Sequence, residues 1–227
     1  MSVIATPAFE GSGASAQEEA YQHILYAIRM GTMRPGDRLV PEEIASSIGM
    51  SRMPVREALR RLTSEGLVTM RPNRGAVVRE LSEKEVIEVF EIRAVLEGLA
   101  AYRAAQNVTD RDLLDLQDLL MRMQRAEPYF PEWITAHRLY HERFCAISDS
   151  PRLMQQIAAL HSTVEPLMRI WLENRANAAR VQQVHEELNR ILAQKKPALM
   201  EQHMREHIRR TATGITEAMR QGQSSGA

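Results

Sequence analysis

Residues 41–78 read PEEIASSIGMSRMPVREALRRLTSEGLVTMRPNRGAVV, and this stretch decides the fold of the N-terminal part of the chain. Pro41 and the two acids after it are typical of a helix N-terminus, and Gly49 ends that short helix. Ser51 is a favourable N-cap for a second helix, and Pro54 falls in the first turn of that helix. Two helices joined by about three residues are typical of a helix-turn-helix motif.

The second helix of this motif has one apolar face and one basic face. The apolar face holds Val55, Leu59 and Leu62, and the basic face holds Arg52, Arg56 and Arg60. A recognition helix places its N-terminal residues against base edges in the major groove of DNA. We therefore expect Arg52, Met53 and Arg56 to reach bases or flanking phosphates. The alternative for each arginine is a solvated side chain without a partner.

A short hairpin is predicted directly after these helices. The strand-like runs 67–70 and 76–78 flank Asn73, Arg74 and Gly75, which supply turn chemistry. A hairpin in this position is the wing of a winged helix-turn-helix head, and Arg74 at its tip is placed to enter the minor groove.

Positive charge is concentrated in this part of the chain. Residues 51–79 contain seven arginines against two glutamates, a net charge of +5, whereas the 29 basic and 29 acidic residues of the whole chain cancel. A neutral chain binds nucleic acid poorly as a diffuse polycation. Affinity for DNA must therefore come from a focused patch, doubled by dimerisation.

Size and composition limit the remaining possibilities. The chain has 227 residues, of which 44% are hydrophobic, so two domains can each bury a core. No apolar run approaches the roughly 20 residues that span a bilayer, and residues 1–16 lack the features of a signal peptide. We expect a cytoplasmic protein without membrane contact. The single cysteine, Cys145, excludes an intrachain disulfide and is predicted to be a buried small hydrophobe.

The predicted fold is mainly α, with an N-terminal winged helix-turn-helix domain over residues 16–80 and an all-α antiparallel helical bundle over 81–221. A helix at 17–30 opens the first domain. Ser82 and Glu85 form a capping-box pattern that opens a long helix, with Val86, Val89, Ile92, Leu96 and Leu99 at helical spacing. Further helices are predicted near 110–126, 131–148, 152–174, 179–194 and 198–220. Flexible ends are expected at 1–15 and 222–227.

Histidines at helical spacing suggest a metal site inside the bundle. His137 and His141 lie four residues apart on one predicted helix, so their side chains project from the same face. His185 lies on a later helix, and on the last helix His207 lies nearer than His203 to the centre of the inward face. Four imidazoles from three helices suit Zn²⁺ or another borderline divalent ion. The alternative is that each histidine is an ordinary core or surface residue.

Two metallopeptidase patterns overlap these histidines. Residues 137–141 have the spacing of H-E-x-x-H, but Arg138 replaces the general-base glutamate, which removes that chemistry. Residues 203–207 match H-x-x-E-H, with Glu206 as the candidate base. This short pattern arises easily by chance in a polar helix, so we expect no enzymatic activity. A metallohydrolase with an accessory DNA-binding module is the alternative from another class.

The chain resembles the GntR superfamily of bacterial transcriptional regulators. The resemblance rests on residues 49–62 and 65–68, with Pro35-Gly36-Asp37-Arg38-Leu39 before them, and it covers nearly all of residues 20–220. The helical part resembles the ligand-sensing domain of the FadR subfamily, because residues 91–97 match its first bundle helix. In this family the DNA contacts correspond to Arg52, Pro54 and Arg56, with Ser51 at the helix cap, Arg74 and Gly75 in the wing, and Arg34 as a further candidate.

The same resemblance implies a metal-dependent sensor. Many family members bind a divalent metal with an Asp-x-x-x-His pair, a histidine 44 residues later and another 22 after that. His141, His185 and His207 match these intervals, whereas His137 stands where the family has aspartate. An all-imidazole site favours Zn²⁺ or Ni²⁺ over Mn²⁺.

The resemblance further implies a homodimer on a pseudo-palindromic double-stranded operator. It also implies a small organic acid as effector, held by the metal and by Arg93. Two alternatives remain open at this point. Arg93 can instead pair with Glu97 on the same helix, and the metal can be purely structural, with no small-molecule effector.

Overall fold

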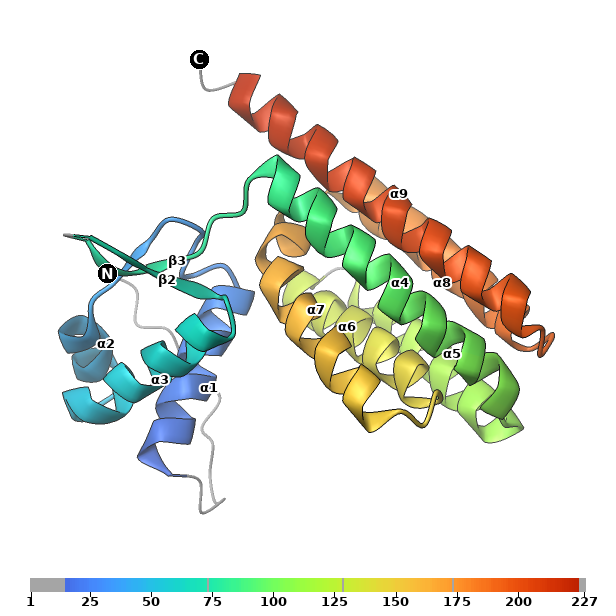
Figure 1. Ribbon diagram of the computed structural model, residues 1–227, viewed down its shortest axis with the longest axis horizontal. Helices are drawn as coiled ribbons and strands as arrows, with labels where there is room; N and C mark the ends of the chain where they lie inside the picture. Colours follow the sequence, from blue (N-terminus) through green and yellow to red (C-terminus); the bar gives the residue numbers. More distant parts are fainter. Residues whose placement is uncertain (1–14, 73, 128, 173, 225–227) are drawn as a thin grey trace. The chain divides into compact units, whose positions relative to one another are not determined.

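The computed structural model describes residues 15–72, 74–127, 129–172 and 174–224 (Figure 1). The turn residue Asn73 and most of the expected flexible ends, 1–14 and 225–227, lie outside these residues. Where the ends are described, Ser15 caps the first helix and the last helix continues to Ser224. The chain divides into two compact units, Met1–Glu80 and Leu81–Ala227.

The first unit contains a helix-turn-helix and a small sheet. Its described elements are α1 (Ala16–Arg29), β1 (Arg38–Leu39), α2 (Pro41–Ser47), α3 (Arg52–Ser64), β2 (Val68–Arg71) and β3 (Gly75–Val78). The helices α1 and α3 pack against each other, and their apolar residues form one core with those of α2 and the sheet. Val55, Ala58 and Leu62 from α3 are fully buried in this core. The apolar face of the recognition helix therefore fixes its orientation on the unit.

The turn between α2 and α3 has the expected residues at its ends. Gly49 follows α2 with a φ of +68°, a left-handed conformation that costs glycine little. Ser51 occupies the N-cap position of α3, but its side chain makes no capping hydrogen bond, contrary to expectation. Pro54 explains this difference, because it stands at the third helical position and has no N–H for the serine oxygen to accept from.

The sheet is larger than the predicted hairpin. It has three antiparallel strands in the order β1-β3-β2, so that Val77 pairs with Thr69 on one side and with Arg38 on the other. The sequence pattern missed β1 because a strand of two residues has no alternation to detect. Its partner β3 lies far along the chain, and β1 forms only when the tertiary fold brings the two together.

The second unit is an all-helical bundle, as predicted. Its described helices are α4 (Glu83–Asn107), α5 (Asp110–Ala126), α6 (Phe130–Ala146), α7 (Pro151–Leu172), α8 (Arg175–Leu192) and α9 (Pro197–Ser224). Ser82 and Glu85 form the predicted capping box of α4. Cys145 is fully buried in α6, also as predicted. Among the described residues, no helix combines the length and hydrophobicity needed to cross a bilayer.

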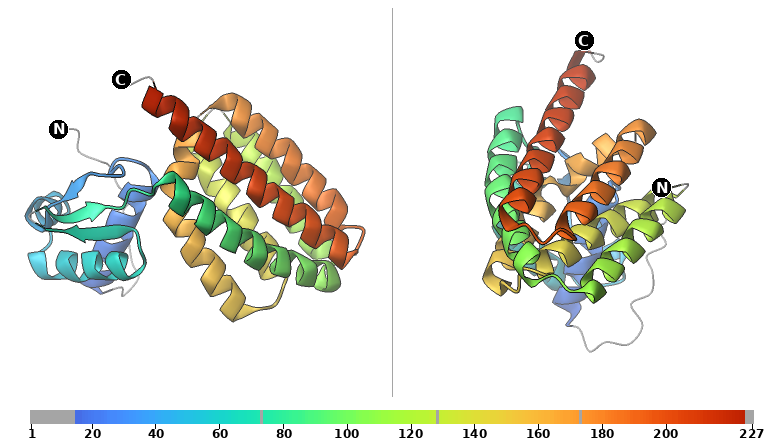
Figure 2. Two further views of the ribbon diagram at one scale, coloured as in Figure 1. Left: turned by 45° about the horizontal axis from the view of Figure 1, so that its top comes forward. Right: turned by 90° about the vertical axis from the view of Figure 1, so that its right-hand side faces the viewer.

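The long helices α4 and α9 run antiparallel, side by side, in both Figure 1 and Figure 2. Gly98 permits their close approach, because a Cβ at this position would lie 2.7 Å from Cγ of Arg205 on α9. The core face of α4 differs from the predicted one. Ile92 and Leu99, two of the apolar residues at helical spacing that predicted an amphipathic helix, are 50% and 40% exposed, whereas alanines such as Ala94 and Ala101 fill the interior.

Candidate functional site

The exposed face of α3 carries the residues expected to contact DNA. The side chain of Arg52 is 69% exposed and lies 3.4 Å from Glu42 Oε1, and Met53 is 63% exposed. Arg56 is also exposed, and it makes no ion pair with any described residue. Pro54 is half-buried. The N-terminal half of α3 thus presents two guanidinium groups and one thioether side chain to solvent.

The other arginines near this face are engaged by carboxylates. Arg60 pairs with Glu57 at 2.6 Å. Arg61 pairs with Glu18 at 2.7 Å and with Glu65 at 3.0 Å, and its guanidinium lies 3.6 Å from the centroid of the Tyr21 ring. Arg61 therefore ties α3 to α1. The net charge of this region overstates the number of cations that are available to phosphate.

The wing and the loop before β1 supply two further exposed arginines. Arg74 lies in the hairpin turn and makes no ion pair with a described residue, and Gly75 begins β3 with a φ of +70°. Arg71, the last residue of β2 before the hairpin turn, pairs with Glu80 at 2.9 Å. Arg34 is exposed, and its backbone N–H donates to Asp37 Oδ2 at 2.7 Å. Among the described residues of α3 and the hairpin turn, Arg56 and Arg74 are thus cations without an ion pair.

In the helical unit, the four histidines chosen from the sequence lie together. His137 and His141 come from α6, His185 from α8 and His207 from α9, and all four are at most 8% exposed. Ring nitrogens of His137, His141 and His185 lie within 4.8 Å of one another. The Nε2 atoms of His141 and His185 are 3.0 Å apart. The ring centroid of His207 lies 5.0 Å from that of His185.

A buried carboxylate lies behind this cluster. Glu97 on α4 is fully buried, and its Oε2 lies 3.7 Å from Nδ1 of His141 and has no hydrogen-bond partner among the residues that the structure describes. Its Oε1 accepts from Nε of Arg93 at 2.8 Å and lies 2.9 Å from Nε2 of His161. Glu97, His141 and His161 form a second close group of possible ligands. His161 was not predicted from the sequence, because it lies outside the 44- and 22-residue intervals that mark His185 and His207.

Arg93 pairs with Glu97 on the same helix, which was the alternative left open by the sequence. It is only 4% exposed, bonds to Glu97, and lies 3.1 Å from Nε2 of His161 through its terminal nitrogen. The cavity bordered by Arg93 and the histidines has a volume of about 30 Å³. This small volume leaves little room for a ligand beside Arg93.

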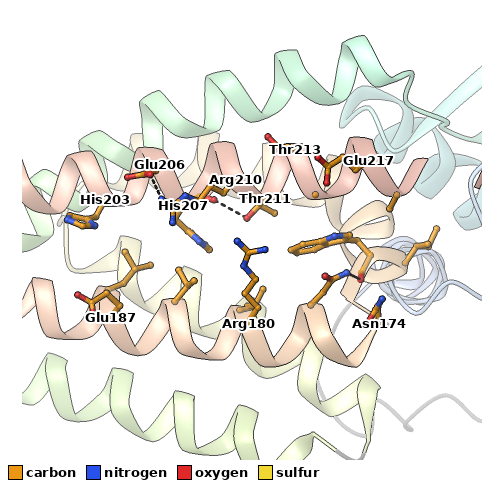
Figure 3. A pocket seen from close by; sticks show the side chains of 18 of the residues that line it. Asn174, Arg180, Glu187, His203, Glu206, His207, Arg210, Thr211, Thr213 and Glu217 are labelled. Atoms are coloured by element: carbon orange, nitrogen blue, oxygen red, sulfur yellow. Dashed lines mark hydrogen bonds and ion pairs between the residues drawn. The ribbon is translucent and has the colours of Figure 1, made fainter. Parts of the chain in front are cut away.

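A much larger cavity opens on the other side of His207. It lies between the C-terminal end of α7, α8 and α9, and its volume is about 810 Å³. Figure 3 shows Arg180 reaching from α8, and His207 from α9, into the space between these two helices. The buried histidine cluster and the open cavity therefore share the wall that His207 forms.

Each of the two units matches a known protein-family model. A model of the gntR family of bacterial regulatory proteins matches residues 16–78, and a model of the FCD domain matches residues 88–210. The transcriptional regulator McbR of Escherichia coli (strain K12) is 31% identical over 170 residues, 74% of this chain and 76% of McbR. The Nta operon transcriptional regulator of Aminobacter aminovorans is 28% identical over 82% of this chain and 88% of its own length.

A solved structure has the same architecture. That of E. coli McbR/YncC is 28% identical in sequence, covers 91% of this chain and 99% of its own, and matches with a TM-score of 0.77. The chain belongs to the GntR family. It is a transcriptional regulator with an FCD domain, as the resemblance implied. The regulators that it resembles are not enzymes.

The H-x-x-E-H pattern of this GntR-family chain has no peptidase geometry. Glu206 pairs with Arg210 and, in Figure 3, points away from the ring of His207. His203 is half-exposed, whereas His207 is buried. The two histidines of the pattern therefore do not converge on one ion.

The electrostatics of the cluster fit a divalent cation. Burial lowers the pKa of His207 from 6.5 to about 3, and burial also holds the pKa values of His137 and His185 well below 6.5. Burial opposes ionisation of Glu97, but Arg93 and His161 hold the pKa of its carboxyl well below 4.5. Neutral imidazoles with free lone pairs, backed by an ionised carboxylate, are the donors that a borderline divalent metal requires.

Proposed function

We propose that this GntR-family regulator binds a pseudo-palindromic double-stranded operator as a homodimer, under the control of a small organic acid and a divalent metal in its FCD domain. The observation that carries the DNA-binding part is the exposed, unpaired guanidinium of Arg56 on a recognition helix beside a wing that carries Arg74. Arg52, Met53, Pro54 and Ser51 begin the helix that enters the major groove, and Arg34, Arg74 and Gly75 lie at the flanking backbone or minor groove.

The metal of this proposal is held by His137, His141, His185 and His207. Zn²⁺ suits four imidazoles best, and Ni²⁺ and Mn²⁺ are the other candidates. When bound, such an ion supplies positive charge and links α6, α8 and α9. Glu97 supports the site from behind His141, because a carboxylate on one ring nitrogen fixes the tautomer that presents the other nitrogen to a metal.

The second copy of the chain is proposed to pack on the exposed face of α4. Ile92, Val95 and Leu99 form an apolar row on this face and are 50%, 46% and 40% exposed. Glu88 and Arg103 lie about two helical turns before and after Val95, and neither makes an ion pair with a described residue. A two-fold axis at Val95 pairs Ile92 with Leu99 of the partner, and Glu88 with the partner's Arg103.

A second candidate is a regulator whose metal is purely structural. The small volume beside Arg93 favours it, because a closed site with four protein ligands leaves little room for an effector on the ion. Calorimetric titration of organic acids into metal-loaded and metal-stripped protein distinguishes the two. Equal binding to both forms assigns the metal a structural role, whereas binding only to the loaded form assigns it a role in sensing.

The DNA-binding proposal is tested by footprinting on the native chromosome, followed by affinity measurements on the protected sequence. We expect protection of two half-sites one helical turn or a multiple apart. Elemental analysis of the purified protein tests the metal, and His141→Ala and His185→Ala should each lower the bound amount. The absence of any protected sequence contradicts the first part, and full metal retention in both variants contradicts the second.

A further inference from the structure

The cavity between α7, α8 and α9 has the size and lining of a ligand site. Its volume of about 810 Å³ falls in the range of small-molecule pockets. Each of the three helices contributes apolar side chains to the lining: Trp171 from α7, Val184 from α8 and Ala218 from α9. Polar groups contribute too: Arg180, Asn177, His207, Arg210 and Thr211.

Among the described residues, the cavity offers a guanidinium that has no carboxylate partner. Arg180 lines it from α8, is exposed, and makes no ion pair with any described residue. Figure 3 shows its side chain extending toward α9 between the two helices. The other arginine of the lining, Arg210, is already paired with Glu206. An anion that enters the cavity therefore finds its strongest available partner at Arg180.

The charge of the remaining lining limits the anion. Glu187, Glu206 and Glu217 also border the cavity, so its carboxylates outnumber its two arginines. A ligand with several carboxylates would bring unpaired negative charge close to these groups, at a Coulombic cost. A single carboxylate pairs with Arg180 without that cost.

The indole of Trp171, in the apolar part of the lining, packs closely against Gly214. A Cβ at Gly214 on α9 would lie 2.8 Å from Cζ2 of Trp171, so the absence of a side chain lets the indole lie against the helix. The indole and Val184 are both partly exposed at the cavity. Such a surface suits an aliphatic or aromatic group.

We propose that this cavity is the effector site, and that it binds a monocarboxylic acid with an apolar body, with the carboxylate on Arg180 and the body against Trp171. The inference rests on the proposed function and replaces Arg93 as the effector residue. Arg93 is 4% exposed, bonded to Glu97 and bordered by about 30 Å³ of space. His207 lines the cavity and belongs to the histidine cluster, so an acid bound there contacts the wall of the metal site.

The test uses calorimetric titration of the zinc-loaded full chain with benzoate and hexanoate. We expect saturable binding of at least one of them. Benzyl alcohol, which lacks the charge, and succinate, which has two carboxylates, should bind at least tenfold more weakly. Arg180→Gln should weaken the probe by roughly tenfold or more, the usual effect of losing a charged hydrogen bond. Arg152→Gln, at an exposed position near the N-terminal end of α7 and outside the cavity lining, should leave binding unchanged.

Gly214→Ala provides a second variant that tests the apolar end. The added methyl must displace the indole, so the probe should again bind more weakly while operator binding without the probe is retained. The inference is overturned if neither carboxylate binds, or if Arg180→Gln and Gly214→Ala both bind them like the wild type.

Operator affinity measured on the same samples separates this inference from the proposed function. We expect the probe to change the operator affinity of the wild type but not that of Arg180→Gln. An equal change in both proteins overturns the cavity assignment and leaves the regulator intact. A wild-type protein that binds no operator under any condition contradicts the proposed function, whatever the calorimetry gives.

Discussion

Glu97 and Arg93 illustrate how a single contact changes the role of a residue. Both lie on α4, one turn apart, and the fold buries them together against His141 and His161. An ionised glutamate in the interior is stable only with charged partners, which Arg93 supplies. The arginine that resemblance assigned to an effector therefore neutralises a carboxylate that faces the histidine cluster.

We predict that Glu97→Gln weakens metal binding by about 10- to 100-fold, the usual cost of losing a carboxylate behind a histidine ligand. Competition with a chromogenic chelator measures this dissociation constant directly. Glu201→Gln is the matched control. Glu201 lies on α9, and its ion pair with a described residue is the one with Arg205, outside the histidine cluster. An unchanged dissociation constant in Glu97→Gln contradicts a role for Glu97 in the site.

The buried histidines predict a pH dependence of the metal-free protein. Burial lowers the pKa of His207 from 6.5 to about 3, so between these pH values the unfolded chain binds a proton that the native chain does not. The free energy of unfolding should therefore be constant above pH 6.5 and fall as the pH decreases. The contribution of this one histidine amounts to about 2 kcal/mol at pH 5.

Urea denaturation of the chelator-treated protein at pH 7.5, 6 and 5 measures this effect. In His207→Gln about one proton fewer is taken up on unfolding, so the free energy of unfolding should fall less steeply than in the wild type. The difference in slope should be roughly 1.4 kcal/mol per pH unit between pH 6 and 5. A variant with the same slope as the wild type rejects the proposed neutral state of His207.

At the scale of a single element, α3 separates its arginines by function. Arg52 and Arg56 face solvent near its N-terminus, whereas Arg61 binds Glu18 and Glu65 and covers the Tyr21 ring. Regular spacing along a helix reveals which residues share a face. It does not reveal which of them meet a carboxylate from another helix.

We predict that two substitutions on this helix affect different quantities, one the operator affinity and the other the free energy of unfolding. Arg56→Ala should lower specific operator affinity by roughly 1 to 3 kcal/mol without changing the free energy of unfolding. Arg61→Ala should lower the free energy of unfolding by about 1 kcal/mol through the lost ion pairs and ring contact. Fluorescence anisotropy on the operator and chemical denaturation measure the two quantities. Equal operator affinity of Arg56→Ala and wild type would refute the assigned recognition surface.

At the scale of the whole molecule, the α4 face predicts how two chains associate. With a two-fold axis at Val95, Val95→Glu places two glutamates opposite each other in an apolar contact. We expect the dimer dissociation constant to rise by at least roughly tenfold, a cost of about 1.4 kcal/mol, in sedimentation equilibrium. Leu114→Glu, at a 60% exposed position of α5, is the control that should leave association unchanged. A Val95→Glu variant that remains fully dimeric excludes this face.

Much of the fold was predictable because it is written in local patterns. Gly49, the capping box of Ser82 and Glu85, and the apolar rows of α3 and α9 act over at most a few turns of chain, where steric and hydrogen-bonding preferences operate without tertiary partners. The strand β1 and the core face of α4 were not predictable in this way. A two-residue strand needs a distant partner, and a helix that is apolar on several faces does not indicate which face turns inward.

By itself, the sequence determined the winged helix-turn-helix and the helical bundle through local patterns, and the resemblance to the GntR superfamily through the matching residues 49–62 and 65–68. Helical spacing, together with that resemblance, selected the four histidines that α6, α8 and α9 bring together. Only the tertiary structure decided that Glu97 and His161 stand behind the histidines, that Arg93 is buried with them, and that an open cavity lies at Arg180. Contacts between helices distant in sequence create these features, because close packing determines which side chains meet a partner and where space remains.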